Sequence, residues 1–307
     1  LSCTMALKIY NNTGVIDMKE KCFYIKPEKV KELLSQIKEM EAAKRGVDSH
    51  VYLIGEYAVL TTDRIKLRNV ITRDDDLAYF DELIKTLKNL QEEGVAVVPI
   101  LGYCFDPDSE NGNGYIFQQR AKGEELYDDV VMKEYYVWAQ NGPSSAFLSS
   151  NTDAKEYILF RTNLISKAPQ KHFDKFISDI LVLLDNDVLV DFNGKSNFFY
   201  DDTIGFQFID IDSHTDYKYG LHEHKYDSKE ICAYNGFVPC HFAVGTNVFK
   251  HLALGEKGIS KLDDKELQQL AQDNRIIFEK CKTAMLNNGI SEEQLNNSLE
   301  ILRIFGC

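Results

Sequence analysis

The sequence predicts an α+β protein of two lobes. Strands dominate residues 46–120, where one helix interrupts them, and the pattern after residue 120 is mostly helical, with one group of short strands near residue 200. Strands and helices that are segregated in this way, rather than regularly alternating, are typical of α+β folds. A chain of 307 residues is long enough for two lobes of ordinary size.

An N-terminal extension is expected over residues 1–45, ahead of a first lobe over 46–120 and a second lobe over 121–307. Residues 26–45 begin near a proline and carry apolar residues at helical spacing: Val30, Leu33, Leu34, Ile37 and Met40. This pattern predicts an amphipathic helix in the extension.

The first lobe is predicted to be an antiparallel sheet with one helix. Residues 50–70 are rich in β-branched and aromatic residues and are interrupted at Gly55, which favours two or three strands. Residues 74–94 start with three aspartates, end at a glycine and have helical periodicity, so we expect a helix there. Two further strands are expected at residues 95–105 and 114–120.

The second lobe is predicted to contain a long amphipathic helix over residues 168–186. Its apolar face would consist of Phe173, Phe176, Ile177, Ile180 and Leu184. Short strands follow over residues 188–212, with turn signals at Asn193-Gly194 and Asp201-Asp202. After residue 240 the pattern is helical, and Ser291 with Gln294 has the spacing of a capping box at the start of the last helix.

The composition excludes several classes of partner. The net charge of −13 and the isoelectric point near 5.1 disfavour binding to nucleic acid or to anionic membranes. Seven scattered cysteines without a CxxC pair indicate reduced thiols, so we expect a cytoplasmic protein. No apolar run in the sequence is long enough for a membrane span. An effector delivered into a host cytosol would have the same composition, and this alternative stays open.

Three polar residues end three short apolar runs: Asp191, Asn197 and Asp210. They fit ordinary turn and strand-end positions. They also fit a phosphoryl-transfer site, because an aspartate can accept the proton of an incoming hydroxyl. Amide and carboxylate oxygens are suitable ligands for Mg²⁺.

In order and spacing these residues resemble the protein-kinase-like fold, which includes kinases that act on aminoglycosides and choline. The resemblance covers about residues 50–255 and implies a bilobal fold with a small strand-rich first lobe and a larger helical second lobe. It implies that Asp191 is the catalytic aspartate of the HRD or HGD loop. It also implies that Asn197 and Asp210 are the metal ligands, with Asp210 in the place of the DFG aspartate.

The chain departs from the family pattern at several of these positions. Asn197 lies six residues after Asp191, one more than usual, and Leu189 and Val190 replace the His-Arg of the family. Without that arginine, activation by phosphorylation of a loop is not expected. Asp212 replaces the DFG glycine and is either a further metal ligand or a solvated loop residue. The second half also lacks the APE and DxWxxG landmarks, which favours a divergent bacterial or effector-like member.

The first lobe contains weaker matches to the motifs of the family. Gly55 is the one glycine left of the glycine-rich hairpin, and Lys66 is similar to the phosphate-binding lysine because Ile65 and Leu67 flank it as in VAIK. Arg68 is an alternative on the same strand face. A surface lysine on an edge strand is the structural alternative for Lys66.

Further nucleotide contacts are implied by the same resemblance. Glu82 would pair with the phosphate-binding lysine, and Asp81 is the alternative for that role. If neither residue has this role, both simply belong to a solvent-exposed helix face. The backbone of Gln118, Gln119 and Arg120 would meet adenine at the connection between the lobes.

The resemblance therefore implies a phosphotransferase that uses ATP and Mg²⁺ and acts on a hydroxyl of a protein or of a small molecule. A pseudokinase, which keeps the fold and transfers nothing, is the alternative that the departures favour. An unrelated α+β interaction protein with coincidental Asp191, Asn197 and Asp210 is the third possibility.

A structural zinc site is an alternative to the kinase-like interpretations. Five residues of zinc-binding type lie close together in the sequence: His222, His224, Cys232, Cys240 and His241. Their spacing does not match the usual pairs of zinc ligands, so an ordinary loop is expected instead.

Overall fold

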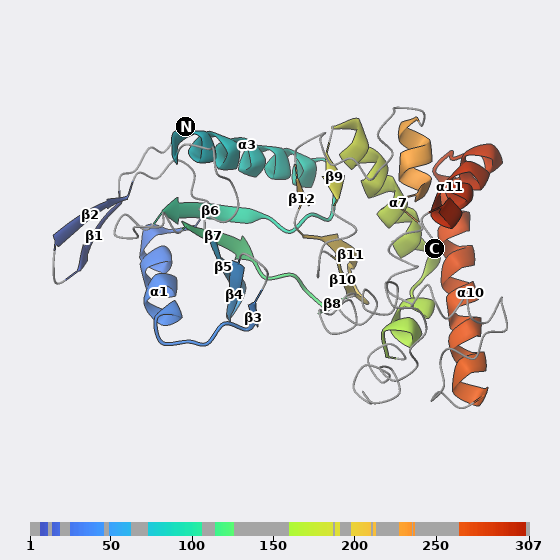
Figure 1. The fold of residues 1–307 in the computed structure, drawn as a ribbon, viewed down its shortest axis with the longest axis horizontal. Helices are drawn as coiled ribbons and strands as arrows, with labels where there is room; N and C mark the ends of the chain where they lie inside the picture. The colour runs from blue at the N-terminus through green and yellow to red at the C-terminus, as the bar shows by residue number, and fades with distance from the viewer. Residues whose placement is uncertain are drawn as a thin grey trace. The chain divides into compact units, whose positions relative to one another are not determined.

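The computed structural model describes most of both halves of the chain, as residues 7–11, 14–18, 25–45, 49–62, 73–105, 114–125, 160–186, 188–190, 198–209, 211–212, 227–234, 236 and 264–304. The chain divides into two compact units, Leu1–Ala121 and Lys122–Cys307. Antiparallel sheets and separate helices make up the described elements, so the predicted α+β class is confirmed (Figure 1).

The first unit is built on a five-stranded antiparallel sheet with the order β3-β4-β5-β7-β6 (Figure 1). The strands are β3 (Lys44–Arg45), β4 (Ser49–Ile54), β5 (Tyr57–Thr62), β6 (Ile100–Phe105) and β7 (Gly114–Gln119). The helix α3 (Arg73–Glu92) lies between β5 and β6 in the sequence, as predicted. A separate hairpin joins β1 (Leu7–Asn11) to β2 (Gly14–Met18).

Two sequence-based boundaries in this unit were wrong. The strand expected from residue 95 begins at Ile100, directly after Pro99, which has no N–H to donate to a ladder. The helix expected over residues 26–45 is α1 (Pro27–Ile37), and the last two residues of that range form β3. Met40 lies beyond the helix and is exposed rather than part of an apolar face.

Two helices cover opposite faces of the five-stranded sheet. Val30 and Leu33 of α1 belong to one buried cluster with Cys104, whereas Ile84 of α3 packs with Tyr103. Successive side chains of a strand point to opposite faces of the sheet. Because Tyr103 packs with α3 and Cys104 with α1, the two helices lie on opposite sides of the sheet. Figure 1 shows α1 and α3 on opposite sides of the strands. The segment expected as an extension thus contributes α1 to the core of this unit.

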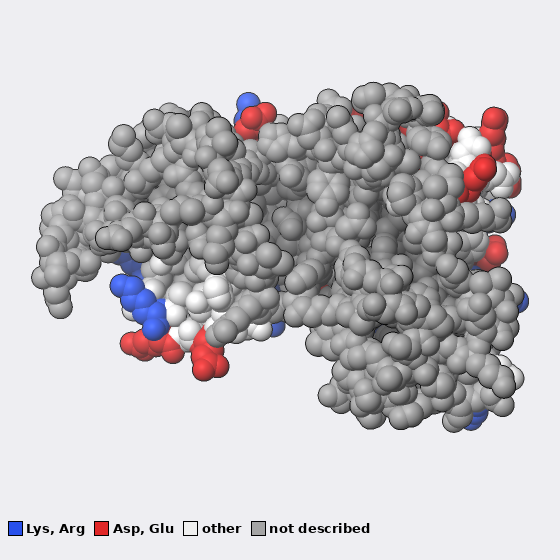
Figure 2. Space-filling view, in the orientation of Figure 1, with Lys and Arg blue, Asp and Glu red and all other residues white. Residues whose placement is uncertain are grey.

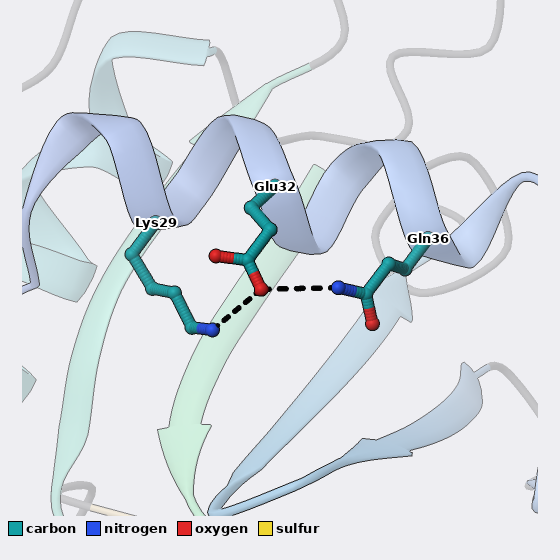
Figure 3. A network of polar contacts seen from close by, with 3 residues as sticks. All are labelled: Lys29, Glu32 and Gln36. Atoms are coloured by element: carbon teal, nitrogen blue, oxygen red, sulfur yellow. Dashed lines mark hydrogen bonds and ion pairs between the residues drawn. The ribbon is translucent and has the colours of Figure 1, made fainter.

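The exposed side of α1 carries a small polar network. Lys29 Nζ donates to Glu32 Oε1 over 2.7 Å, and Gln36 Nε2 donates to the same oxygen over 3.1 Å (Figure 3). Charges of both signs lie together over this helix in the lower left of Figure 2. Exposed pairs of this kind contribute only a few tenths of a kcal/mol. The apolar face, and not this network, therefore fixes α1 on the sheet.

The second unit combines helices with two small sheets. Its labelled helices are α7 (Gln170–Asp185), α10 (Asp264–Asn287) and α11 (Glu292–Ile304), and residues 160–166 and 228–234 are also helical. One sheet has the order β11-β10-β8, formed by β8 (Glu124–Glu125), β10 (Phe198–Asp201) and β11 (Gly205–Phe208). The other pairs β9 (Leu189–Val190) with β12 (Ile211–Asp212).

The apolar face of α7 forms the core of this unit. Four of the five predicted residues are buried, namely Phe173, Phe176, Ile177 and Ile180. The fifth prediction was off by one residue, because Leu183 is buried and Leu184 is only half-buried. This face packs against β11 on one side and α10 on another.

Two capping boxes interlock in the second unit. The predicted box at α11 is confirmed, since Ser291 N donates to Gln294 Oε1 over 2.8 Å and Gln294 N donates to Ser291 Oγ over 3.2 Å. Asp227 and Glu230 form the same reciprocal pair at the start of helix 228–234. Gln294 Nε2 also donates to both carboxylate oxygens of Asp227, at 2.9 and 3.2 Å. One side chain therefore links the starts of two helices.

None of the helices in the described part of the chain combines the length and the apolar character that crossing a bilayer requires.

In Figure 2, acidic side chains gather over α11 at the right of the view. The first turn of that helix contains Glu292 and Glu293, whose charges favour a helix N-terminus.

Replacing the cap of α11 gives a first prediction. Ser291→Ala should lower the free energy of unfolding by about 1 kcal/mol, because the N–H of Gln294 loses its acceptor. Urea denaturation monitored by circular dichroism measures the change. Ser291→Thr, which keeps a hydroxyl, is the matched control and should stay within about 0.5 kcal/mol of the wild type. Equal losses in both variants would contradict a capping role.

Candidate functional site

The ladder between β9 and β12 joins the two chain segments that border the predicted catalytic and metal residues. Val190 pairs with Ile211 in antiparallel register, and Leu189 pairs with Asp212. Asp212 therefore belongs to a strand and not to a loop. Asp191 follows Val190 in the sequence and Asp210 precedes Ile211, and both aspartates lie outside the described residues.

An aromatic cluster fixes the hairpin of β10 and β11 on α7. Phe176 of α7 stacks on Phe208, with ring centroids 5.5 Å apart and an interplanar angle of 8°, and lies 4.8 Å from Phe206. Phe198 meets Phe176 and Phe208 edge to face at 6.3 and 5.6 Å. Close-packed rings of this kind hold the backbone in one position. The chain that runs towards Ile209 is therefore held by the helix.

Asn197 directly precedes Phe198, the first residue of β10, and lies outside the described residues. Phe198 is fully buried in the aromatic cluster. The position that follows Asn197 in the chain is thus among the most firmly packed of the second unit.

The turn between β10 and β11 uses its acidic residue for structure. Asp201 Oδ1 accepts hydrogen bonds from the N–H groups of Thr203 and Ile204, at 2.9 and 3.0 Å. Gly205 then adopts a φ of 88°. The turn predicted at Asp201-Asp202 is confirmed, and the carboxylate of Asp201 is engaged within it.

A buried histidine supports the same hairpin. His172 Nδ1 of α7 and Tyr200 Oη of β10 are joined by a hydrogen bond of 2.9 Å. Burial lowers the pKa of His172, and the charge of Lys171 adds to this effect, while Asp201 and Asp202 oppose it. Burial also raises the pKa of Tyr200 to about 12. The pair is therefore an uncharged contact near neutral pH.

The segment that enters the second unit is bound to this hairpin by a glutamine. Lys122 N donates to Gln207 Oε1 over 3.3 Å, and Gln207 Nε2 donates to the carbonyl of Lys122 over 2.7 Å. Glu124 then pairs with Tyr200 in the β8–β10 ladder. Arg161 Nη1 donates to the carboxylate of Glu124 over 2.9 Å. None of these contacts is predicted by a pattern in the sequence.

Gly123 lies where the entering segment comes closest to β10. Its φ is 78°, and a Cβ built on it would lie 2.1 Å from the carbonyl oxygen of Tyr200. Residues other than glycine cannot occupy this position without moving one of the two backbones.

In the first unit, the structure describes two of the residues predicted for the phosphate-binding region, Gly55 and Glu82. Gly55 forms the tight turn between β4 and β5 with a φ of 59°. Glu82 is exposed on α3, one residue before the buried Leu83 and Ile84. An ion pair of Glu82 would be exposed to solvent and worth at most about 1 kcal/mol. Lys66, like Arg68, lies outside the described residues.

The backbone predicted to meet adenine is already hydrogen-bonded. Gln118 is buried, and its Nε2 donates to a backbone carbonyl 3.2 Å away. The N–H of Gln119 donates to the carbonyl of Pro99 over 3.0 Å, and the N–H of Arg120 donates to the carbonyl of Glu56 over 2.7 Å. An adenine bound through either N–H group would have to replace one of these bonds.

The described residues give no support to the zinc alternative. Cys232 is buried in helix 228–234, with its thiol near the carbonyl of Ile177, and burial raises the pKa of that thiol. A buried, protonated thiol is a poor zinc ligand. The other four candidates, His222, His224, Cys240 and His241, lie outside the described ranges. Within those ranges, no three His, Cys, Asp or Glu residues come together as a metal site would require.

Comparison with known proteins adds no family to these observations: a scan against protein-family models found no match, and a search of curated proteins found none either.

Substitution of Gly123 tests the close approach to β10. Gly123→Ala should cost about 1–2 kcal/mol for the positive φ and about 1–3 kcal/mol more for the clash with Tyr200. Gly94→Ala is the matched control, because Gly94 has a φ of 88° and nothing within 4 Å of its Cβ position. Chemical denaturation measures both. Equal losses would show that the clash is relieved without cost.

The buried histidine makes stability depend on pH. The pKa of His172 is lowered in the folded state, so the folded protein binds fewer protons than the unfolded chain. Stability should therefore fall as the pH drops below about 6.5, with a slope of up to about 1.4 kcal/mol per pH unit. His172→Gln should remove this part of the slope in urea titrations between pH 7.5 and 5. Tyr200→Phe should retain it, because burial is the main cause; a slope unchanged by His172→Gln would contradict the assignment.

Proposed function

We propose that the chain is a phosphotransferase that uses ATP and Mg²⁺ and acts on a hydroxyl of a protein or of a small molecule. The observation that carries the proposal is the antiparallel pairing of Val190 with Ile211. Partners in an antiparallel ladder lie about 4.5–5.5 Å apart at Cα. The residues bonded to Asp191 and Asp210 are therefore neighbours, which a joint role of the two aspartates requires.

Each residue of the predicted set has a defined task in this proposal. Asp191 orients the acceptor hydroxyl and takes its proton. Asn197 and Asp210 offer an amide and a carboxylate oxygen, the hard donors that suit Mg²⁺, so the donor set fits the ion by its chemistry. When bound, ATP and Mg²⁺ supply the phosphoryl group and neutralise its charge.

The packing around these positions also supports the proposal. A functional side chain must be held within about 0.5 Å of its working position, which packed elements achieve better than free loops. Val188 is buried just before β9, and Phe198 and Phe208 are buried in the aromatic cluster on α7. The chain is thus firmly packed close to each of the three predicted residues in the sequence.

The nucleotide residues of the first unit receive less support. Glu82 is exposed, so a pair with Lys66 or Arg68 would add little to binding. Binding of adenine to the N–H of Gln119 or Arg120 would exchange one hydrogen bond for another and gain little. Among these residues, we therefore retain Lys66 as the main phosphate contact of the proposal.

A second candidate, the pseudokinase, rests on the departure of the chain from the family pattern at Leu189 and Val190. Leu189 and Val190, which replace the His-Arg of the family, are both taken up in the ladder with β12. A binding module that keeps this ladder and transfers no phosphate would fit the same described residues. Measurement of phosphate transfer separates the two candidates.

Binding of ATP with and without Mg²⁺ is the direct test. At a hundredfold excess over Kd, ligand binding should raise stability by about 2.7 kcal/mol, which thermal unfolding detects. Asp210→Asn should selectively remove the Mg²⁺-dependent part, because a charged ligand is lost with little change of volume. Asp191→Asn should leave binding intact and lower turnover by about 10²- to 10⁴-fold.

Asp202→Asn is the matched control for these two variants. Asp202 is exposed in the β10–β11 turn, so the substitution changes the charge by the same amount away from the ladder. Its Mg²⁺-dependent shift and turnover should equal those of the wild type. Absence of any thermal shift at millimolar ATP and Mg²⁺ in the wild type would overturn the proposed function, and binding without transfer to any acceptor would favour the pseudokinase.

A further inference from the structure

We infer that Gln207 is a positioning residue, whose carboxamide fixes the strand leading towards Asp210 to the segment through which the chain enters the second unit. The bonded groups are the side chain of Gln207 on β11 and the peptide groups of Lys122. The consequence for catalysis rests on the proposed function, whereas the contact itself does not.

The carboxamide of Gln207 bonds to the backbone of Lys122 in the same way as a neighbouring strand would. The carboxamide both accepts from the N–H and donates to the carbonyl of the same residue, Lys122. Gln207 is only 8% exposed. An apolar substitute would leave the peptide groups of Lys122 without these partners. Because Lys122 is itself exposed, each lost bond should cost the ordinary net value of about 0.5–1.5 kcal/mol.

Neighbouring residues of the entering segment are bound to the same hairpin. Gly123 lies against the carbonyl of Tyr200, closer than any side chain would permit. Glu124 and Glu125 pair with β10, and Glu124 also accepts from the buried Arg161. Each residue from Lys122 to Glu125 therefore has a specific contact within the second unit, and Gln207 provides the first of them.

The chain just before this segment is bonded within the first unit instead. The N–H of Arg120 donates to the carbonyl of Glu56. Only Ala121 stands between that bond and the bond of Lys122 to Gln207. Lys122 is therefore the first residue of the second unit, and its two bonds to Gln207 join it to β11.

This position makes Gln207 relevant to the metal ligand of the proposed function. Gln207 lies three residues before Asp210 in the sequence, and Phe206 and Phe208 on either side of it pack on Phe176. The aromatic side chains hold one face of β11, and the glutamine holds its other face. Residues that orient a metal ligand typically contribute 10- to 100-fold to metal affinity or activity.

The first arm of the test measures the contact alone. In Gln207→Met, an apolar variant of similar length, hydrogen exchange of the amides from Lys122 to Glu125 should accelerate at least about tenfold, since a bond of about 1.4 kcal/mol corresponds to that factor. Gln170→Met is the matched control. Gln170 Nε2 donates to the carbonyl of Lys280 over 2.8 Å and to Asp174 Oδ1 over 3.3 Å, so the control also removes two hydrogen bonds of a glutamine side chain.

The second arm measures the consequence for Mg²⁺. At a fixed ATP concentration, Gln207→Met should raise the Mg²⁺ concentration needed for half of the thermal shift by about tenfold. Gln170→Met should leave that concentration unchanged even if its melting temperature falls equally. Gln207→Glu is the second variant if Gln207→Met does not fold. It loses the donor and places a carboxylate oxygen against the carbonyl oxygen of Lys122, and this repulsion should open the contact and give the same two changes.

The outcomes separate this inference from the proposed function. If the wild type responds to ATP and Mg²⁺ but the Gln207 variants have the wild-type Mg²⁺ dependence, the positioning role is wrong and the proposed function stands. If the wild type does not respond, the proposed function and the role of Gln207 in positioning a metal ligand both fail. Unchanged exchange at residues 122–125 would overturn the contact itself.

Discussion

The second unit depends on the packing of one helical face against one hairpin. Phe173 and Phe176 of α7 contact the rings of Phe198, Phe206 and Phe208, and these contacts fix the strands β10 and β11 on the helix. Buried aromatic side chains contribute most of the apolar area in such a contact, and truncation of one to alanine typically costs about 3–5 kcal/mol. The polar contacts of the hairpin, those of Gln207 and His172, act on a backbone that this packing has already placed.

The polar groups around the hairpin divide into two kinds. Asp201, His172 and Gln207 are engaged in structural hydrogen bonds, at 2.7–3.3 Å from their partners. These bonds give the three side chains structural roles in the hairpin. Asp191, Asn197 and Asp210 lie next to the ladder and the hairpin in the sequence, outside the described residues, and remain the set on which the proposed phosphoryl transfer depends.

The features that the sequence predicted well depend on residues close together in the chain. The apolar face of α7, the turn at Asp201 and the capping box of Ser291 are all set by spacings of a few residues. The features that it missed join residues far apart. The bond of Gln207 to Lys122 spans 85 positions. Gln207 stands out in the sequence only as a polar residue between two phenylalanines, and no local pattern marks Lys122. The site roles of Asp191, Asn197 and Asp210 stay predictions, because order and spacing suggest a role without fixing the positions of atoms.

The link between Gln294 and Asp227 affects the order in which the second unit can be completed during synthesis. Helix 228–234 leaves the ribosome before α11, yet Asp227 receives two hydrogen bonds from Gln294 of the later helix. Ser298 of α11 also donates to the carbonyl of Glu230. The nascent chain thus holds an incompletely bonded helix until α11 emerges. Formation of the unit is therefore expected to be completed in a cooperative step only after α11 has been synthesised, since domains generally fold as units.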